Sequence, residues 1–599
     1  MKILEHCLCA AVLRASAFLL AASLVTVLAP AQSVSSNSDS IRGVVVNSAT
    51  HEPIPRALVY SPDNRFATMT NSEGRFEFNI SHPETTREAS PDSNATNNGQ
   101  PVQATGRPYL LTARKPGFMT DPGNPMQNLQ NENVKDVTIT LIPEGLIVGS
   151  VSLPSSEAPD KIMLQIFRRQ VQEGHARWVP AGGAQSTSDG QFRFADLPAG
   201  TYKLLTHELL DRDPLSLDPL TIGPGNRTPQ KLFGYPPVYY QNASDFSSAT
   251  VIHLSAGQTQ TVNLTLAKQQ YYHVKVPVIS DNENPLRVEV YSHGRKGPGF
   301  SLAHNPGSHA IEGWLPSGTF TIEASNDGSQ GLSGAQSINV RGGTVEGPSM
   351  TLVPNASIPI VVKEEFTSED HTGPTTYSIN GHRTVVKGPR RYLYVMLAPA
   401  DDLGTGRMFT MREPTTSGDD ALFIDGAPAG SYWVRVHSSR GYPVSIRSGN
   451  LDLRHQPLVV GIGGGASPIE ITMRDDTGEI SGTVAGLAPP SGSATSDTQA
   501  SASAGAAPQA MAHIYFVPLP DSAGQFSEIW SAPDGSFTNP LVAPGAYRAL
   551  AFDREMQDLE YQNPAEMLTY DSKGPVVRVL PGQKETVQLQ LIPTSNATE

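Results

Sequence analysis

The chain has 599 residues, of which 53 are glycine and 50 are proline, so turn-forming residues make up about a sixth of it. With 38% hydrophobic and 17% charged residues, it is too apolar for general disorder and too rich in glycine and proline for a helical bundle. The formal net charge is −14 with both signs interspersed, which argues against nucleic acid or anionic lipid as a partner. The class that remains is an all-β protein of several domains.

Residues 1–31 have the pattern of an export signal. Lys2 and Arg14 supply positive charge, residues 15–28 form an uncharged apolar run, and residues 29–31 (Ala-Pro-Ala) match a small-residue cleavage site. An uncleaved membrane anchor is the alternative, but the apolar run is shorter than the ~20 residues that a spanning helix needs. No later stretch is apolar enough to span a bilayer, so we expect no transmembrane segment in the mature chain.

The cysteine content points to a compartment. Cys7 and Cys9 are the two cysteines of the sequence, and both lie inside the predicted signal. The mature chain would therefore contain no thiol, whereas small secreted eukaryotic domains commonly depend on disulfides. This usage favours a bacterial protein that is periplasmic, bound to the cell surface or secreted.

One pattern recurs along the rest of the chain. A turn with glycine precedes alternating apolar residues, and its glycines are Gly74, Gly190, Gly307, Gly418 and Gly535. A second turn, Pro-x-Gly-x-aromatic or similar, follows it with glycines at Gly200, Gly318, Gly430 and Gly545. Both series repeat at about 114 residues, so five similar units fill the chain after the signal.

The second unit shows how such a repeat is expected to fold. Phe192 and Phe194 are two residues apart and point to one face of a half-buried strand, while their neighbours are polar. Gly190 accepts the positive φ of the tight turn before this strand, and Gly200 ends the turn after it. Such short strands must pair as two stacked sheets to bury their apolar faces, so each unit is predicted to be a small antiparallel β-sandwich.

The repeat sets the predicted boundaries. Two stretches, 82–108 and 487–510, have too few apolar side chains to offset the entropy of ordering, and we expect disordered inserts there, with binding loops as the alternative. The predicted segments are the signal 1–31, a linker 32–40, and sandwiches at 41–144 (with the first insert), 145–268, 269–355, 356–475 and 476–599 (with the second insert).

The first unit resembles the carboxypeptidase regulatory-like domain, a prealbumin-like sandwich. It carries Gly-x-Val, Pro-x-Pro-x-Ala-x-Val, a threonine strand that leads into Glu-Gly-x-Phe-x-Phe, and a Pro-Gly-Phe turn. The matching positions are Gly43, Val45, Pro53, Pro55, Ala57, Val59, Thr70, Gly74, Phe76, Phe78, Pro116, Gly117 and Phe118. Units two and five share the framework, whereas units three and four lack the opening Gly-x-Val and are assigned by spacing. The resemblance implies an accessory, non-catalytic domain that is grouped with carbohydrate-binding-like folds.

The sequence offers no support for catalysis. It contains none of the metalloprotease, serine-hydrolase or phosphate-loop motifs, and the mature chain has no cysteine nucleophile. Its histidines are scattered, and its acidic clusters do not match a calcium loop, so we take them as solvated loops. We therefore expect no catalytic residues, no metal and no cofactor.

Tyrosine clusters are the candidate binding residues. Tyr235, Tyr239 and Tyr240 lie together in one unit, and Tyr561 and Tyr570 lie at the corresponding place in the fifth. Their rings could serve as platforms for sugar rings, or they could instead plug the edges of the sandwiches. The four tryptophans lie on or beside predicted strands and are expected in or near the cores: Trp178, Trp314, Trp433 and Trp530.

These features predict an exported, non-enzymatic binding or scaffold protein of the cell envelope or extracellular space. Its partner would be a polysaccharide or another envelope protein, and rigid repeated modules would recognise it through loops and sheet edges. One alternative is a structural stalk without a ligand of its own. The other is an accessory subunit of a secreted peptidase or polysaccharide-processing system.

Overall fold

The structure is a computed structural model, and it describes residues 39–594 apart from 64, 81–108, 122–126, 130–136, 155–160, 212–230, 281–283, 295, 327–330, 370–374, 380–381, 404–405, 417 and 488–510. The predicted export signal, most of the predicted linker and the insert 82–108 lie outside the described residues. The same holds for all but the first residue of the insert 487–510.

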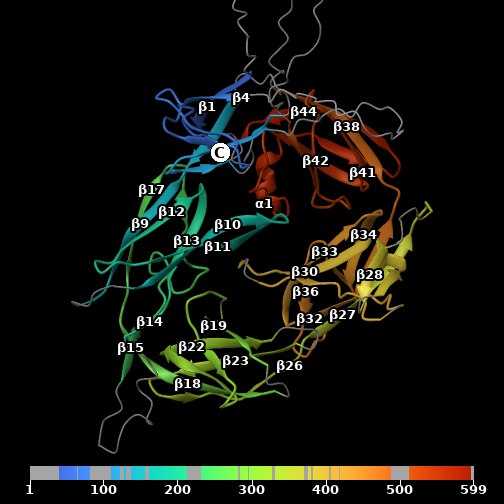
Figure 1. Cartoon of the computed structure of the whole chain (residues 1–599). Helices are drawn as coiled ribbons and strands as arrows, with labels where there is room; N and C mark the ends of the chain where they lie inside the picture. The colour runs from blue at the N-terminus through green and yellow to red at the C-terminus, as the bar shows by residue number, and fades with distance from the viewer. Residues whose placement is uncertain are drawn as a thin grey trace, which may run out of the picture.

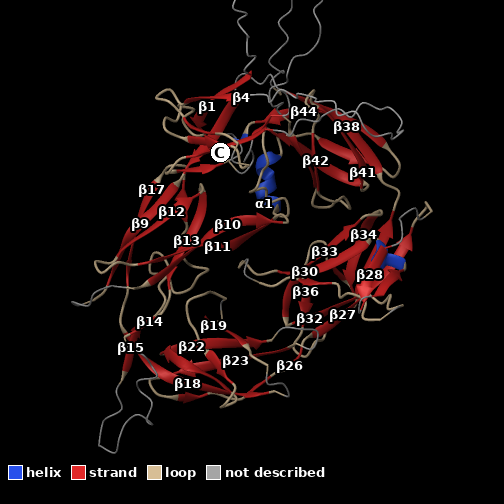
Figure 2. Ribbon diagram, viewed as in Figure 1, coloured by secondary structure: helices blue, strands red, loops and turns tan. Residues whose placement is uncertain are grey.

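Almost every regular element of the described chain is a β-strand, and these strands form tandem β-sandwiches, which confirms the predicted fold class (Figure 2). The described helical elements are α1 (Pro564–Met567) and two 3₁₀ turns, η3 (Gly388–Arg391) and η4 (Leu568–Tyr570).

One strand-pairing scheme recurs five times. A central strand lies between an antiparallel partner and a parallel partner from the end of the repeat. The central strands are β1 (Asp39–Asn47), β9 (Gly145–Ser152), β18 (Gln269–Ile279), β27 (Ala356–Glu365) and β38 (Gly478–Ala485). Their antiparallel partners are β4 (Arg75–Ile80), β12 (Gln191–Leu197), β21 (Ala310–Pro316), β32 (Phe423–Ala427) and β41 (Ser536–Val542). Their parallel partners are β8 (Val137–Pro143), β17 (Thr259–Thr265), β24 (Val345–Glu346) with β25 (Met350–Thr351), β37 (Ile469–Arg474) and β44 (Lys584–Ile592).

A second layer of strands faces each of these central sheets, and in sandwich 5 the two layers are joined where the end of β42 (Gly545–Phe552) pairs with the end of β44. In the first repeat its strands, in spatial order, are β3 (Ala67–Met69), β2 (Leu58–Tyr60), β5 (Tyr109–Arg114) and β7 (Gln127–Leu129). In the second they are β11 (His175–Gln185), β10 (Met163–Gln172), β13 (Gly200–Thr206) and β16 (Ile252–Leu254), and in the third β19 (Arg287–Ser292), β22 (Gly318–Ser325), β23 (Leu332–Val340) and β26 (Val353–Pro354). In the fourth they are β31 (Phe409–Thr410), β30 (Leu393–Pro399), β33 (Gly430–Ser438) and β36 (Leu458–Val460), and in the fifth β40 (Ser527–Trp530), β39 (His513–Pro518), β42 (Gly545–Phe552) and β43 (Val576–Val579).

The remaining strands extend these sheets or form small hairpins. They are β6 (Phe118–Thr120), β14 (Leu209–Leu210), β15 (Leu232–Tyr235), β20 (Ala303–Asn305), β28 (Thr375–Ile379), β29 (His382–Val386), β34 (Tyr442–Ser448) and β35 (Leu451–Asp452). We call the repeats sandwiches 1 to 5, built from β1–β8, β9–β17, β18–β26, β27–β37 and β38–β44. Sandwiches 3 and 4 follow the same pairing scheme as the others, although they lack the Gly-x-Val signature. The residue boundaries set from the sequence stay a prediction.

The apolar alternation builds one core in each sandwich. In β12, Phe192 and Phe194 are buried while Gln191 and Arg193 are exposed, as the period-two pattern predicts. Gly190 has a φ of 79°, which confirms the tight turn before this strand. Five clusters of buried apolar side chains, one between the two sheets of each sandwich, follow the same rule.

The opening Gly-x-Val signature has a packing explanation. In sandwiches 1, 2 and 5, its glycine lies opposite a phenylalanine of the antiparallel neighbour and a valine of the parallel neighbour. A Cβ at this position would overlap the valine carbonyl oxygen and lie within 2.8 Å of the phenylalanine ring. The three sets are Gly43 with Phe76 and Val137, Gly149 with Phe192 and Val262, and Gly482 with Phe537 and Val587. The glycine is therefore required by the ring that lies on it.

The aromatic residue after the second turn also has a defined role. In sandwiches 2, 4 and 5 it is a buried tyrosine whose hydroxyl donates to the carbonyl oxygen four residues earlier. The pairs are Tyr202 with Pro198, Tyr432 with Pro428, and Tyr547 with Ala543. The turn is thereby tied to the strand that follows it.

Replacing Tyr432 with phenylalanine is expected to destabilise sandwich 4 by about 1 kcal/mol, because the Pro428 carbonyl oxygen loses its 2.9 Å hydrogen bond. Urea unfolding of the full chain, followed by hydrogen exchange in β33, measures this loss. Tyr394→Phe in the neighbouring strand is the control, since its side chain is 42% exposed. Equal effects of the two substitutions would contradict the role of the hydroxyl.

The sandwiches do not form a straight string. In Figure 1, sandwiches 1 to 5 follow one another around a ring-like arrangement, and the hairpin β10–β11 of sandwich 2 points to its middle. Hydrogen bonds join the sandwiches across the middle of this ring. The Trp178 amide donates to the Asp402 carbonyl oxygen of sandwich 4 at 2.7 Å. The Gln562 amide of sandwich 5 donates to the Gly174 carbonyl oxygen at 3.2 Å. Sandwich 2 therefore contacts both sandwich 4 and sandwich 5.

Candidate functional site

Two of the predicted tyrosine positions are packing sites. In sandwich 2, a segment after β15 lies over the outer face of β10 and β13, where Tyr239 and Phe246 cover Phe167 and Leu205. In sandwich 5, the segment with α1 covers β39 and β42 in the same manner. Buried side chains of that second cluster are Tyr515, Leu550, Phe552, Leu559 and Tyr570. Each of these sandwiches therefore has a second apolar cluster outside its main core.

The structure places the five predicted binding tyrosines in two separate groups. Tyr235, Tyr239 and Tyr570 are buried, with exposures of 3%, 3% and 8%. The Tyr239 hydroxyl donates to the Pro298 carbonyl oxygen of sandwich 3 at 2.8 Å, so it joins two sandwiches. These three rings have no free face for a sugar, because protein atoms cover them. Of the five predicted binding tyrosines, Tyr240 and Tyr561 remain as candidates, because both are half-buried.

Tyr561 lies in a row of aromatic rings beside the hairpin β10–β11. Its ring stacks on Phe526 at 3.8 Å between centroids with planes 4° apart, and Phe526 lies 6.0 Å from Tyr515. One edge of the Tyr561 ring approaches the hairpin tip, because a Cβ at Gly174 would lie 2.7 Å from its Cε2 atom. Burial and the charge of Glu173 raise the pKa of Tyr561, so its hydroxyl stays protonated.

The hairpin tip is a two-residue turn in which Glu173 and Gly174 have φ values of 52° and 77°. Positive φ at both positions gives the right-twisted turn that joins long paired strands. This geometry carries β10 and β11 beyond the body of sandwich 2. The tip therefore reaches sandwiches 4 and 5.

A cleft of about 510 Å³ opens between this hairpin and sandwich 5. We call it the hairpin cleft. Three aromatic rings, one guanidinium and four carboxylates line it: Tyr515, Phe526, Tyr561, Arg168, Glu173, Glu528, Glu555 and Asp558. The four carboxylates are on exposed residues, whereas the rings are buried or half-buried. The cleft thus combines apolar surfaces at its base with hydrogen-bond acceptors at its rim.

The contact with sandwich 4 involves two tryptophans. The His175 ring stacks on Trp433 with 4.3 Å between centroids. Burial, together with the charges of Arg435 and Arg177, lowers the pKa of His175 to about 4, so the ring is neutral at pH 7. Trp178 packs at the second cluster of sandwich 2, where Leu403 of sandwich 4 joins it. Trp433 and Trp178 are therefore half-buried at the contact between sandwiches.

The expectation of a core position is wrong for Trp530, which is 63% exposed. Its indole N–H donates to His513 Nδ1 at 3.0 Å on the outer side of edge strand β40. Trp314 is half-buried on β21, with its ring 5.3 Å from that of His273.

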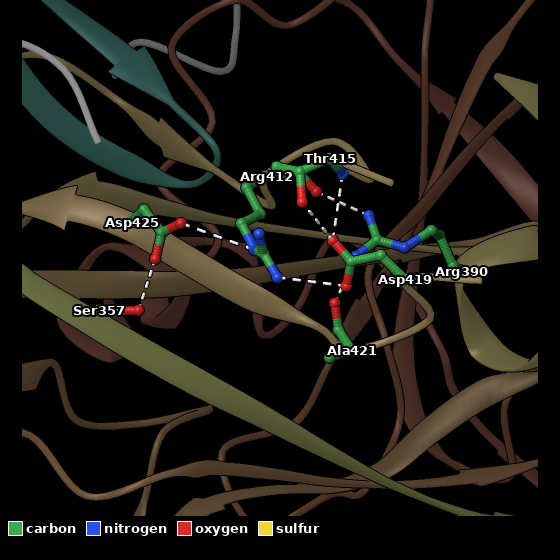
Figure 3. A network of polar contacts seen from close by, with 7 residues as sticks. All are labelled: Ser357, Arg390, Arg412, Thr415, Asp419, Ala421 and Asp425. Carbon is green, nitrogen blue, oxygen red and sulfur yellow. Dashed lines mark hydrogen bonds and ion pairs between the residues drawn. The ribbon is translucent and has the colours of Figure 1, made fainter. Parts of the chain in front are cut away.

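A second hollow, of about 340 Å³, lies in sandwich 4. Arg412 and Asp425 line it and form part of the network in Figure 3, whose other members are Ser357, Arg390, Thr415, Asp419 and Ala421. Arg412 pairs with Asp419 at 3.2 Å and with Asp425 at 3.6 Å. Hydrogen bonds from Thr415 and the charge of Arg412 lower the pKa of Asp419. This network holds β31 and β32 together, and its charges are balanced by one another.

Arg390 holds the inner end of the same network. It is 3% exposed and donates to the carbonyl oxygens of Arg412 at 2.6 Å and Ala421 at 2.5 Å. Its role is therefore to fix two loops of sandwich 4. For this reason we regard the hairpin cleft, not this hollow, as the candidate binding site.

Within the described ranges, no group of three or more His, Cys, Asp or Glu side chains is placed to hold a metal ion. Over the same part of the chain, no helix has the length and apolar character needed to cross a bilayer.

The joint between sandwiches 2 and 3 contains a half-buried carboxyl group, that of Glu208. Glu208 Oε1 accepts from the Ser301 amide at 2.9 Å and from the Ser301 hydroxyl at 2.6 Å. Burial raises the pKa of Glu208 to about 7, although these hydrogen bonds act in the opposite direction. The protonated form of Glu208 is thus favoured below about pH 7 in the folded joint.

We expect this joint to be more stable at pH 5 than at pH 8. A folded-state pKa above the ordinary value means that the stabilisation is complete below about pH 4.5 and is lost as the pH rises through 7. Hydrogen exchange of the Ser301 amide, corrected for the intrinsic rate, measures the opening of the joint at the two pH values. Glu208→Gln should remove the difference, and a variant that keeps it would show that another group titrates.

The local sequence signal for the hairpin is confined to its turn. Residues 163–172 and 175–185 are separated by Glu173 and Gly174, and the glycine accepts the positive φ that a two-residue turn needs. What the pattern does not disclose is that this hairpin contacts residues more than 200 positions away.

Sequence comparisons find no family model that matches the chain and no curated protein that matches it. Among solved structures, the TIE protein of Bacillus anthracis is similar at 11% identity over 52% of this chain and 50% of that chain, with a TM-score of 0.15. A minor pilin of Streptococcus agalactiae is similar at 13% identity over 38% of this chain and 96% of that chain, with a TM-score of 0.16. Two B repeat units of the collagen-binding protein of Staphylococcus aureus give 12% identity, 73% and 100% coverage, and a TM-score of 0.12. The chain spans half the length of the first of these proteins, and at these scores no property of any of them is carried over.

Proposed function

We propose that the chain is an exported, non-enzymatic binding scaffold whose ligand site is the hairpin cleft. The observation that carries the proposal is the lining of this cleft, where Phe526 and Tyr561 form an apolar base and Glu173, Glu528 and Glu555 stand at the rim. The described lining of this cleft contains no serine, threonine, cysteine or lysine nucleophile and no histidine base. Its rings and exposed carboxylates are groups that support binding.

A carbohydrate is the ligand class that this lining favours. Aromatic rings pack against the C–H faces of sugars, and carboxylates accept hydrogen bonds from several hydroxyl groups at once. The resemblance of sandwiches 1, 2 and 5 to the carboxypeptidase regulatory-like domain, grouped with carbohydrate-binding-like folds, supports the same proposal. Because the rim carries four carboxylates and one guanidinium, a neutral or amino sugar fits better than a uronic acid.

The cross-contacts of sandwich 2 favour this scaffold over an extended stalk. In a straight string, sandwich 2 would contact only sandwiches 1 and 3, whereas here it also bonds to sandwiches 4 and 5. The cleft depends on this folding back, since its two walls come from sandwiches 2 and 5.

The experiment is a binding screen of the full mature chain against soluble polysaccharides. We would use affinity electrophoresis with a neutral β-glucan, xylan, chitin oligosaccharides and polygalacturonate, followed by calorimetry on the polymers that retard the protein. Binding to a neutral or amino polymer is expected. The acidic polymer is expected to bind weakly, because the rim carboxylates repel it.

Two variants tie any binding to the cleft. Phe526→Ala is expected to weaken binding at least about tenfold by removing the ring beneath the ligand. Glu528→Gln should weaken it without changing the fold, since this residue is exposed. Glu346→Gln, an exposed carboxylate of sandwich 3, is the matched control. No retention on any polymer, or equal retention of all variants, would refute the cleft as a carbohydrate site.

A further inference from the structure

We propose that the hairpin β10–β11 is a clasp, which folds the string of sandwiches back on itself and can leave its docking faces on sandwiches 4 and 5 without unfolding them. The inference goes beyond the proposed function, because it concerns the conformation of the chain without ligand. The two are connected, since the hairpin cleft exists only where the clasp is docked.

The docking face on sandwich 4 is visible in the alternation of β33. Tyr432 and Val434 point into the core of that sandwich, whereas Trp433 and Arg435 point outward. An outward-facing tryptophan would normally be exposed, yet Trp433 is half-buried, because His175 of the hairpin stacks on it. The Arg435 guanidinium donates to the Glu173 carbonyl oxygen at 3.3 Å. These two neighbouring outward side chains of β33, Trp433 and Arg435, thus hold the hairpin.

The docking face on sandwich 5 fits the other side of the tip. Arg169 forms an ion pair with Glu560, a carboxylate that is only 7% exposed. The Gln562 amide donates to the Gly174 carbonyl oxygen at 3.2 Å. Gly174 allows this approach, since any side chain there would collide with Tyr561. In the described part of sandwich 5, Asn563 donates a hydrogen bond to this carboxylate but no cation pairs with it, so Arg169 of the hairpin supplies the positive charge.

Sandwich 4 also reaches back toward the clasp. Its loop after β30 places Leu403 beside Trp178 and brings the Asp402 carbonyl oxygen to the Trp178 amide. The Arg177 guanidinium, 5% exposed, donates to the Pro399 carbonyl oxygen of the same sandwich. The docking is therefore specific in register as well as in charge.

The composition of these contacts makes the docking reversible. They are mainly polar and consist of an ion pair, hydrogen bonds to main-chain carbonyls, one ring stack and a single apolar contact, between Leu403 and Trp178. Within the described residues, the core clusters of sandwiches 4 and 5 contain no residue of the hairpin. Interfaces of this polar kind between domains of one chain commonly open and close. Each sandwich keeps its own core when the hairpin leaves.

The test combines small-angle scattering with hydrogen exchange on the full mature chain without ligand. Trp433→Ala removes the ring stack on the outer face of β33 and leaves the core of sandwich 4 intact. We expect a larger radius of gyration and a larger maximum dimension. We also expect at least about a tenfold loss of protection at the amides of Trp178 and Gln562, which donate across the clasp.

Two further variants serve as a control and as an independent test of the clasp. Tyr394→Ala removes an outward aromatic of the neighbouring strand β30 and should leave scattering and exchange unchanged. Arg435→Ala breaks a second clasp contact and should act in the same direction as Trp433→Ala. Exchange within the β10–β13 ladder reports whether sandwich 2 itself stays folded.

The outcomes separate the clasp from the proposed function. A wild-type chain that scatters as an extended string, or clasp variants that keep their dimensions and their protection at Trp178 and Gln562, would overturn the clasp whatever the polysaccharide screen shows. A closed wild-type chain that opens in the variants but binds no polysaccharide would confirm the clasp and refute the carbohydrate site.

Discussion

Replacing Gly149 with alanine is expected to destabilise sandwich 2 by about 3 kcal/mol, the upper part of the range for overpacking a core. The added Cβ would overlap the Val262 carbonyl oxygen and lie 2.8 Å from the Phe192 ring. A main-chain oxygen cannot rotate away, so β9 and β17 must separate. Gly43 and Gly482 have the same surroundings, and alanine there should damage sandwiches 1 and 5 in the same way.

The control for this prediction lies in the same sandwich. Gly183 in β11 is exposed, and a Cβ there would have its nearest neighbour at 3.8 Å. Gly183→Ala should therefore change stability by less than about 0.5 kcal/mol. Urea unfolding, with hydrogen exchange measured separately for each sandwich, gives the stability of both variants. Comparable losses of stability in the two variants would show that the neighbouring phenylalanine ring does not require glycine at the Gly-x-Val position.

Lys203→Met is expected to destabilise the outer cluster of sandwich 2 by about 2–3 kcal/mol, because a buried cation and its hydrogen bonds are lost together. Lys203 is 6% exposed, and its Nζ donates to the carbonyl oxygens of Phe246 at 2.8 Å and Ser247 at 3.0 Å. The same Nζ lies 4.9 Å from the centre of the Trp178 ring. Burial lowers the pKa of Lys203, and Asp402 and Asp245 oppose that shift.

The effect should extend beyond sandwich 2. Trp178 binds sandwich 4 through its main chain, so loosening its ring should increase exchange at its amide. Lys231→Met, which removes an exposed lysine of the same sandwich, is the comparison. If Lys203→Met and Lys231→Met unfold at the same urea concentration, the buried ammonium does not stabilise the cluster.

Local pattern was sufficient for the fold. The alternation of Phe192 and Phe194, and the glycines at 190 and 200, predict strands and turns because each acts within a few residues. The repeat then extends this plan to sandwiches 3 and 4, where β18 and β27 pair as β9 does.

Contacts between residues that are distant in the sequence do not follow from such local patterns. Nothing in the surroundings of Tyr239 or Tyr570 indicates that each covers the outer face of its own sandwich. The period-two pattern of β33 places Trp433 outward, but it does not state that His175 will cover it. The candidate site arises between sandwiches 2 and 5, so only Tyr561 among its lining residues was predicted.

The pairing of the first and last strands has a mechanical consequence. In sandwiches 1, 2, 4 and 5 these strands run parallel and are hydrogen-bonded, so the chain enters at one end of the pair and leaves at the other. Tension between the two ends would act along the strands and load their hydrogen bonds in shear, all at once, instead of peeling them apart singly. A stretched chain would therefore first straighten at the contacts between sandwiches, while each sandwich bears the load as a folded link.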